Sequence, residues 1–532
     1  MDGDENILLE IKDLLVNFYT YQGTVQAIEG IDLLIYKGET LGIVGETGCG
    51  KSVTANTIMN LILSPPGKIE AGDIFFMEPN EVRKRRKQYE AEAQDWYARK
   101  PLPEKRKLVA TYGPRFTGFK KRVKPVTNAQ VQKIVPPAKA PNKLLRSYLS
   151  NKAKKIPKTD ATSRDAALHS YNLLRKSVEY MQKIRGRFIS MIFQEPTSAL
   201  NPVFTAGDQI SEVILVHRKG EMAGRALKRI QNEQKAHREG GRPRKVFSKE
   251  SGTGRQSVAC SACRAPAKME DIWCSKCGVQ FYNPLSWSLR NMIQRYNTRM
   301  LQLIFKKSDS SVNLLARIPL FNSYKKFLYE EAIRESVRML DVVRIPDPMG
   351  VAMRFPFELS GGMQQRVMIA MALACNPKLL IADEPTTALD VTIQGQILKL
   401  MRDLKVEYGS SILLITHNLG VVAEMCDRVG VMYAGSMAEV GVSRVIFKAP
   451  MHPYTMGLMK SVPSIQMEAA KLYTIRGMVP NLIYPPSGCR FHPRCDYAKE
   501  YCKKVKPELL EIEKGHFVSC HMVSKAEGYV AQ

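Results

Sequence analysis

The chain has 532 residues, of which 44% are hydrophobic, and a formal net charge of +28. This length predicts two or more modules with ample apolar material for a core. No run approaches the roughly 18 apolar residues of a membrane-spanning helix, which excludes such a helix. The first residues, Met1 to Glu5, are acidic and lack the basic and apolar regions of a signal peptide. We therefore expect a cytoplasmic protein, and the clustering of eight of its eleven cysteines in two metal-type groups suits that reducing compartment.

The positive charge is concentrated in two segments. Residues 81–187 hold 29 Lys and Arg against 8 Asp and Glu, a net charge of +21. Residues 218–307 hold 20 against 6, a net charge of +14, so the remaining 335 residues carry −7. Such charges predict that both segments seek an anionic surface, either the cytoplasmic leaflet of a membrane, an RNA or acidic faces of protein partners. A solvated insertion with no partner is the alternative.

The chain begins with apolar runs that predict short strands at residues 7–16 and 26–35. Three aromatic residues, Phe18, Tyr19 and Tyr21, lie between these runs. An aromatic ring at this place is suited to stacking on adenine, and Tyr21 is the best candidate. The alternative is a strand residue that packs on its neighbours.

A phosphate-binding loop follows. Residues 45–52 read Gly-Glu-Thr-Gly-Cys-Gly-Lys-Ser, after an apolar strand at 39–44 and before an apolar helix at 53–63. In this context backbone N–H groups and the helix N-terminus cradle phosphates. Lys51 is expected to reach the β- and γ-phosphates and Ser52 to ligate Mg²⁺. The predicted ATP-binding residues are Gly45, Glu46, Thr47, Gly48, Cys49, Gly50, Lys51, Ser52, Val53 and Tyr21.

A further strand at 72–76 precedes the first basic segment. The scattered prolines and the many Lys and Arg residues of 81–187 predict an insertion that is partly helical and partly flexible. Core-like sequence resumes with an apolar strand at 188–193 that ends at Gln194. A helix is predicted at 207–217.

Cysteines recur in the second basic segment as two C-x-x-C turns. Each tight turn presents two thiolates to one side of a tetrahedral ion, which is zinc-ribbon geometry. Four thiolates leave no open position, so we predict a structural metal, zinc before others, with free thiols or a redox pair as alternatives. The predicted ligands are Cys260, Cys263, Cys274 and Cys277.

The densest motifs follow an amphipathic helix predicted at 329–343. Residues 359–364 read Leu-Ser-Gly-Gly-Met-Gln and precede a long helix. Residues 379–384 form a buried strand that ends in Asp383 and Glu384. Carboxylates at a strand end can hold the Mg²⁺ shell, as expected for Asp383, and orient or deprotonate a water, as expected for Glu384.

Two shorter motifs complete the series. Ala388-Leu389-Asp390 follows the paired carboxylates, and a strand at 412–416 ends in His417. An imidazole at a strand end is placed to sense the γ-phosphate. Each motif alone is a weak signal, but their order and spacing after a phosphate loop are specific.

In this order the motifs resemble those of ABC-type ATPase subunits. The resemblance implies an α/β fold, a P-loop ATPase with a RecA-like core and antiparallel β and helical subdomains. It makes Glu384, His417 and Gln194 catalytic, and it places Mg²⁺ at Ser52, Gln194 and Asp383. It also implies that two domains sandwich two ATP molecules head to tail. The signature residues Ser360, Gly361, Gly362 and Gln364 would then contact the partner's ATP, and Asp390 would belong to the D-loop.

The resemblance narrows to the ATP-binding subunits of dipeptide/oligopeptide (peptide/nickel-type) importers. It is carried by Val44–Gly48, Phe193–Pro202, Asp383–Thr392 and a tail from His452 to His521. It implies two transmembrane permease subunits, a second ABC ATPase subunit and, indirectly, an extracellular solute-binding protein. The chain would then lie at the cytoplasmic face of the membrane, with possible contact to anionic lipid. Dipeptides, longer peptides, nickel complexes and sugars all stay open as substrates.

A nucleic-acid-handling ABC ATPase is the rival hypothesis, because basic insertions and a zinc ribbon can grip DNA or RNA. The single set of ATPase motifs and the importer-type tail argue against it. The usual importer subunit, in turn, lacks both basic segments and the ribbon.

The tail contains four further cysteines, Cys489, Cys495, Cys502 and Cys520, without a C-x-x-C pair. Similar tails in the resembled subfamily can carry a [4Fe–4S] cluster, and four cysteines satisfy its ligand count. Zinc or no metal are the alternatives, and His492, His516 and His521 are alternative ligands.

These expectations divide the chain into six parts. They are a first core part at 1–80, a basic insertion at 81–187, the Q-loop and start of the helical subdomain at 188–217, a basic insertion at 218–328 with the ribbon at about 256–282, a second core part at 329–450 and the C-terminal extension at 451–532.

Overall fold

The structure, a computed structural model, describes residues 6–112, 142–157, 159–239, 258–259, 266–267, 287–306, 323–387, 390–461 and 474–523. These residues form two compact units. One unit takes the chain up to residue 200 and from residue 360 onward, and the other takes residues 201–359. Among the helices in the described ranges, none is both long and apolar enough to cross a bilayer.

The first unit contains a three-stranded antiparallel sheet in the order β2-β1-β4. Its strands are β1 (Ile7–Thr20), β2 (Gly23–Tyr36) and β4 (Gly67–Phe76). Leu9 of β1 is buried and pairs with Phe76 of β4. The apolar side chains of this sheet join the main hydrophobic core of the unit.

An eight-stranded sheet forms the centre of the same unit, in the order β12-β13-β11-β10-β3-β9-β8-β5. Its strands are β3 (Thr40–Val44), β5 (Ile189–Ile192), β8 (Leu379–Asp383), β9 (Ser411–Ile415), β10 (Arg428–Tyr433), β11 (Ser436–Val442), β12 (Leu510–Glu513) and β13 (His516–Val518). The run from β10 to β5 is parallel. Strands buried on both faces read as continuous apolar runs, as these do.

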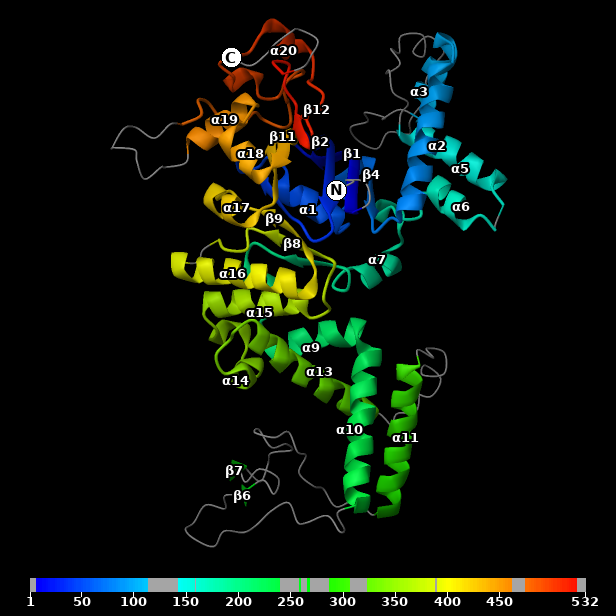
Figure 1. Cartoon of the computed structure of the whole chain (residues 1–532), viewed down its shortest axis with the longest axis vertical. Coiled ribbons are helices and arrows are strands. Elements are labelled where there is room, and N and C mark those ends of the chain that lie inside the picture. Colours follow the sequence, from blue (N-terminus) through cyan, green and yellow to red (C-terminus); the bar gives the residue numbers. More distant parts are fainter. Residues whose placement is uncertain are drawn as a thin grey trace. The chain divides into compact units, whose positions relative to one another are not determined.

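Helices lie along this sheet (Figure 1). Helix α1 contacts β8, α15 contacts β5 and α17 contacts β3. The helices of this part are α1 (Lys51–Ile58), α8 (Pro196–Ala199), α15 (Gly361–Leu373), α16 (Val391–Tyr408), α17 (Leu419–Met425), α18 (Ser443–Lys448), α19 (Pro453–Lys460), η4 (His492–Arg494) and α20 (Glu500–Lys504). The strands predicted from the sequence are confirmed, with β1, β2 and β4 longer than expected. Helix α1 is shorter, because the chain turns at Asn60 with a φ of 51°.

The described part of the first basic segment is mostly helical, with turns between the helices. Its elements are α2 (Asn80–Ala98), α3 (Leu102–Tyr112), α5 (Asn142–Lys155), α6 (Ala161–Leu168), η1 (Leu173–Arg175) and α7 (Val178–Ile184). Val82, Tyr89 and Leu149 belong to a small hydrophobic cluster of its own. Leu173 and Met181 belong instead to the main core, so the end of this segment is part of the ATPase framework. The helical part of the expectation is confirmed, and residues 113–141 lie outside the described residues.

Arg86 of α2 joins the basic segment to the three-stranded sheet. Its side chain is 0% exposed and donates to Glu78, Glu90 and, from β1, Glu10. Its guanidinium carbon lies 3.7 Å from the ring centroid of Phe75 in β4. Burial lowers the pKa of Arg86, but its hydrogen bonds to Glu78 and the nearby carboxylates outweigh burial and raise the pKa above its ordinary value. Arg86 therefore stays charged in the interior, as a buried ion pair requires.

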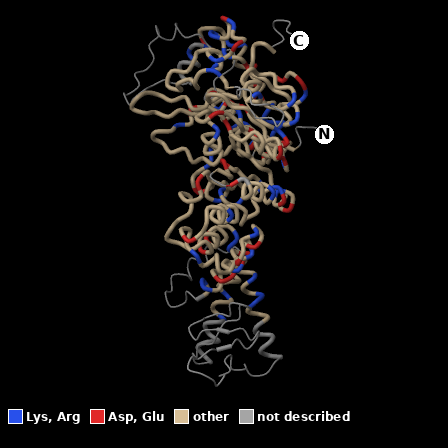
Figure 2. The backbone as a smooth tube through the Cα atoms, turned by 90° about the vertical axis from the view of Figure 1, so that its left-hand side faces the viewer, with Lys and Arg blue, Asp and Glu red and all other residues tan. Residues whose placement is uncertain are grey.

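The second unit is helical and contains part of the second basic segment. Its elements are α9 (Ala206–His217), α10 (Lys219–Glu239), α11 (Trp287–Phe305), α13 (Ser323–Val342), α14 (Pro348–Ala352) and η3 (Pro356–Glu358). A capping box between Thr205 and Asp208 starts α9. Helices α10 and α11 contact each other. Figure 2 shows Lys and Arg in blue and Asp and Glu in red along the described backbone.

Ion pairs fix α10 to α13 within the second unit. Arg225 of α10 and Arg218, the residue directly before α10, both reach Glu335, at 2.6 and 3.0 Å. Arg229 pairs with Glu330 at 2.9 Å. Part of the basic charge is thus neutralised inside the unit by carboxylates of a neighbouring helix.

The predicted zinc ligands Cys260, Cys263, Cys274 and Cys277 lie outside the described residues. The structure does describe two short strands beside the first pair, β6 (Val258–Ala259) and β7 (Pro266–Ala267). They are antiparallel, with Val258 opposite Ala267. Their pairing brings together the two ends of the segment that contains Cys260 and Cys263.

Candidate nucleotide-binding site

Four parallel strands deliver the predicted motifs to one edge of the eight-stranded sheet. The phosphate loop follows β3, Gln194 follows β5, Glu384 follows β8 and His417 follows β9. Because these strands are parallel, their carboxyl ends share an edge, where ligands of open α/β sheets bind.

The phosphate loop requires glycine at two tightly enclosed positions. Gly45 has a φ of 153° and Gly50 a φ of 101°. A Cβ on Gly45 would lie 2.2 Å from the Met432 carbonyl oxygen, and one on Gly50 would lie 2.7 Å from that of Ala27. The loop therefore curls closely against β10 and β2, which turns its backbone toward the start of α1.

Lys51 is held inside this loop. Its buried ammonium donates to the Gly45 carbonyl at 2.8 Å and to the Glu46 carbonyl at 3.1 Å. Cys49 is also buried, and burial raises the pKa of its thiol, which keeps it neutral and unreactive. Lys51 is thus the one cation within the loop motif itself.

Ser52 and Asp383 face each other at the start of α1. The Ser52 hydroxyl donates to Asp383 Oδ1 at 3.1 Å. Burial raises the pKa of Asp383, and the neighbouring Glu384 carboxylate adds to the rise, while Ser52 and Lys51 oppose it. A hydroxyl and a carboxylate in contact form the oxygen donor set that Mg²⁺ prefers.

Glu384 lies between the other two predicted catalytic residues. Gln194 Nε2 donates to Glu384 Oε2 at 3.2 Å, and His417 Nδ1 lies 3.2 Å from Glu384 Oε1. Thr387 also donates to Glu384 Oε2, at 3.0 Å. Glu384 has a φ of 47°, a strained conformation for a residue with a Cβ, and such strain clusters at functional sites. The amide of Gln194 and the imidazole of His417 therefore both contact the carboxylate of Glu384.

The sequence matches agree with this arrangement. The model of the ABC transporter family matches residues 28–156 and 294–387. The model described as the oligopeptide/dipeptide transporter, C-terminal region, matches residues 438–502. The dipeptide transport ATP-binding protein DppD of Bacillus subtilis is 31% identical over 513 residues, which cover 96% of this chain and 94% of the relative. The chain belongs to the ABC transporter ATP-binding proteins.

Two further similarities extend this comparison. The oligopeptide transport ATP-binding protein OppD of Salmonella typhimurium is 30% identical, with 97% of this chain and 93% of the relative covered. A solved dimeric structure of the ATP-binding cassette MJ0796 aligns with 15% identity and a TM-score of 0.40, over 82% of this chain and 99% of the cassette. The family assignment rests on the sequence relatives.

In this ABC ATPase the signature residues lie on a separate element from the phosphate loop. Ser360 caps α15, with its side chain accepting from the Met363 N–H, and Gly361 and Gly362 open the helix. Gln364 is buried one turn later. Asp390 caps α16 by accepting from the Ile393 N–H at 2.8 Å, while Ala388 and Leu389 lie outside the described residues.

Tyr21 lies at the turn between β1 and β2 and is 90% exposed. The packing alternative is therefore wrong for this side chain. Its role in adenine stacking stays a prediction. Thr47 and Gly48 lie in the loop, and Val53 on α1 packs partly against the main core.

The four C-terminal cysteines of this ABC ATPase line one cavity, together with His452, His492 and His521. Burial raises the pKa of Cys489 and of Cys520 to about 11 each, and the thiols of the other cysteines add to the rise. Within the described chain, no group of three or more His, Cys, Asp or Glu side chains stands in an arrangement that holds a metal ion. The cavity therefore gathers four soft donors, but not in an arrangement that holds a single metal ion.

His516 is not one of the alternative ligands. It is buried and its Nε2 lies 2.8 Å from Glu439 Oε1, in a structural pair between β13 and β11. The prediction that His516 is an alternative metal ligand was wrong. It relied on the nearness of His516 to the cysteines in sequence, whereas the partner of His516 is Glu439, 77 residues away. His452, which was not predicted, lines the cavity instead.

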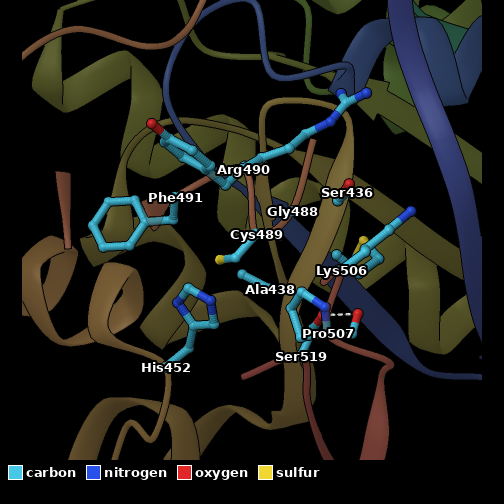
Figure 3. A pocket seen from close by; sticks show the side chains of 12 residues that line it. Ser436, Ala438, His452, Gly488, Cys489, Arg490, Phe491, Lys506, Pro507 and Ser519 are labelled. Atoms are coloured by element: carbon cyan, nitrogen blue, oxygen red, sulfur yellow. Dashed lines mark hydrogen bonds between the residues drawn. The ribbon is translucent and has the colours of Figure 1, made fainter. Parts of the chain in front are cut away.

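A second cavity adjoins the cysteine segment, lined by Ser436, Ala438, His452, Cys489, Lys506 and Ser519 among others (Figure 3). Ser519 donates to the Pro507 carbonyl at 3.1 Å across its wall. The Arg490 side chain extends away from Cys489 in this view, and its guanidinium meets the loop after β10. It reaches the Ala434 carbonyl there and pairs with Glu29 at 2.8 Å. The extension is thus fastened to the framework beside the phosphate loop, a contact that sequence motifs did not signal.

Proposed function

We propose that this ABC ATPase hydrolyses ATP to power the import of peptides through a partner permease. The observation that carries the proposal is the gathering of Gln194, Glu384 and His417 at the sheet edge beside the phosphate loop. Peptides are favoured as the solute because curated relatives that align along nearly the whole chain are peptide-transport ATP-binding proteins. The match to the oligopeptide/dipeptide transporter C-terminal region points the same way.

The chain's own residues account for the hydrolytic step. Lys51 and the loop N–H groups would bind the phosphates, and Ser52 with Asp383 would hold Mg²⁺, which supplies charge neutralisation for the phosphates. Glu384 accepts a proton from the attacking water or orients it, while Gln194 and His417 fix the carboxylate from either side. The hydrogen bonds that Oε2 accepts from Gln194 and Thr387, and the contact of Oε1 with His417, fix the direction of the Glu384 carboxylate.

Hydrolysis by this scheme requires two ATPase subunits. Ser360 and Gly361 open α15 at the first unit's surface, where both are exposed. A helix N-terminus with free N–H groups favours an anion. We propose that this terminus contacts the γ-phosphate held by a second ABC subunit, whether a copy of this chain or a related one.

Affinity purification from detergent-solubilised membranes of the protein's own cells tests the partnership. The tagged chain should bring with it two polytopic membrane proteins and a second ABC ATPase. The rival, a nucleic-acid-handling ATPase, predicts RNA or DNA in the eluate without such membrane proteins. That second result would overturn the importer proposal.

The exposed basic residues of the first segment are proposed to contact the anionic cytoplasmic leaflet or the permease. Lys84 and Arg85 on α2, and Lys154 and Lys155 on α5, are exposed. Basic residues close to an anionic membrane each contribute about 1 kcal/mol of binding. This contact would keep the subunit at the membrane face.

Charge reversal tests the membrane contact. The variant Lys84→Glu, Arg85→Glu, Lys154→Glu, Lys155→Glu should sediment less with phosphatidylserine vesicles at low salt, and this difference should vanish at high salt. Deleting residues 81–187 is not a suitable test, because Leu173 and Met181 belong to the main core. The same vesicle binding by variant and wild type would contradict the proposal.

The two cysteine groups are proposed as structural metal sites. The β6–β7 pairing next to Cys260 and Cys263 supports a zinc ribbon at residues 260–277. The four thiols that line one cavity support a [4Fe–4S] cluster at the C-terminal group, with ligands of the number and softness that such a cluster takes.

Elemental analysis separates these assignments. Anaerobically purified protein should contain iron and sulfide that fall in a Cys495→Ser variant, and about one zinc that falls in a Cys274→Ser variant. Cys375→Ser is the matched control, because Cys375 lies outside both groups. Unchanged iron in Cys495→Ser would make the cluster assignment wrong, whatever the ATPase activity.

A further inference from the structure

Glu46 of the phosphate loop is held by three different contacts. Its carbonyl accepts from Lys51 at 3.1 Å, and its N–H donates to the Tyr454 hydroxyl at 3.0 Å. Its carboxylate pairs with Arg494, which lies beyond the ATPase core in the C-terminal extension. The conformation of this part of the loop therefore depends on residues about 400 positions away in sequence, since 408 and 448 residues separate Glu46 from the two partners.

The Arg494–Glu46 contact is bidentate. Nη1 lies 2.7 Å from Oε2 and Nη2 lies 3.0 Å from Oε1, the fork geometry in which arginine binds a carboxylate with most directional specificity. The Arg494 side chain is 6% exposed and that of Glu46 28% exposed. Such burial protects the pair from screening by salt, unlike an exposed ion pair.

Arg494 is itself fixed before it meets Glu46. Its Nε donates to the Arg476 carbonyl at 2.9 Å and its Nη1 to the Tyr433 hydroxyl at 3.3 Å. Tyr433 packs against Tyr454, with ring centroids 4.6 Å apart, and Tyr454 is fully buried. The guanidinium of Arg494 and the hydroxyl of Tyr454 thus belong to one packed cluster, and both hold Glu46.

A carboxylate in a phosphate loop opposes ATP unless it is neutralised and turned aside. Lys51 is the cation in the loop motif, and the Glu46 charge, left unpaired, would offset its attraction for phosphate. The guanidinium of Arg494 removes this offset and fixes the direction of the carboxylate. We propose that Arg494 is a positioning residue for ATP, which acts through Glu46 and makes the C-terminal extension part of the nucleotide site. This inference concerns ATP binding and is independent of the transported solute.

Equilibrium binding of ATP to the full-length chain tests the proposal, with Glu384→Gln present in every variant so that ATP is not consumed. Arg494→Ala should weaken ATP binding about tenfold, within the range for directly coupled neighbours. Arg494→Lys, which keeps the charge but not the fork, should lose less. Arg444→Ala is the matched control, because Arg444 is exposed on α18.

A second substitution separates positioning from a merely structural role. Adding Glu46→Gln to Arg494→Ala should restore most of the lost affinity, because the unpaired carboxylate is then gone. A variant that had lost its fold would not be rescued by a change in the loop. ATP affinity in Arg494→Ala equal to that of the control, or no recovery in the double variant, would overturn the proposal.

Discussion

Replacing Glu384 by glutamine should lower the rate of ATP hydrolysis by about 100-fold or more and leave ATP affinity close to that of the wild type. Glutamine keeps the shape of the side chain but cannot accept the proton of the attacking water. Lys51, Ser52 and Asp383 remain to bind the phosphates and Mg²⁺, so binding is preserved. Phosphate release by the complete transporter complex and ATP binding by equilibrium dialysis measure the two effects.

A surface substitution of the same kind provides the control. Glu407→Gln lies on the exposed side of α16 and should hydrolyse ATP at the wild-type rate. Near wild-type turnover in Glu384→Gln would remove Glu384 from the catalytic role. Loss of ATP affinity together with turnover would show that Glu384 acts in binding, which the Ser52–Asp383 contact does not predict.

Replacing Arg86 by leucine should destabilise the first unit by about 3–5 kcal/mol. The change leaves the carboxylates of Glu10, Glu78 and Glu90 without their shared buried cation. Arg85→Leu, one residue away at an exposed position, should change stability by less than about 0.5 kcal/mol. Urea unfolding followed by circular dichroism measures both variants.

The deficit of Arg86→Leu should depend on pH. Burial raises the pKa of Glu90, but the charges of Lys12 and Arg86 outweigh it and hold the pKa below its ordinary value. A carboxyl with a lowered folded-state pKa stabilises above its unfolded pKa, and this contribution is lost as pH falls through the folded pKa. Wild type therefore loses more stability than Arg86→Leu on acidification, and the gap should narrow. A gap that is constant with pH would mean that lost packing on Phe75, rather than lost charge, causes the effect.

The nucleotide site could be predicted from the sequence because its residues lie in short local motifs at strand ends. The loop at 45–52, the carboxylate pair after β8 and His417 after β9 each carry a signal within a few residues. Parallel strands then bring them to one edge, which the apolar runs already indicated. The order of the motifs along the chain was therefore enough to predict that these residues lie close together in the fold.

The contacts of the basic segment and of the C-terminal extension could not be predicted in this way. Arg86 meets Glu10 across 76 residues, and Arg494 meets Glu46 across 448. Neither ion pair is indicated by a motif or by a characteristic spacing within a short stretch of sequence. In α2 the apolar residues Val82, Tyr89 and Ala93 are buried, but the many Lys and Arg between them conceal the helical pattern and favoured an interpretation as partly flexible.

His516 is a second case in which a contact between residues distant in sequence could not be predicted. Proximity in sequence to Cys520 favoured a place among the metal ligands, but its partner Glu439 lies on the neighbouring strand β11. Sheet pairing decided the contact, and pairing between distant strands has no signal in a single short motif. The cavity lined by four cysteines was expected from the family resemblance, since residues 489–520 show no ligand spacing of their own.

Peptide uptake by cells in which the chromosomal copy of this chain carries Glu384→Gln tests the importer proposal. We expect loss of labelled di- or oligopeptide uptake, with the variant present at wild-type level, uptake of an unrelated sugar unchanged and Glu407→Gln cells indistinguishable from wild type. Unchanged uptake of every peptide tested, under conditions in which the wild-type chain is produced, would contradict the account.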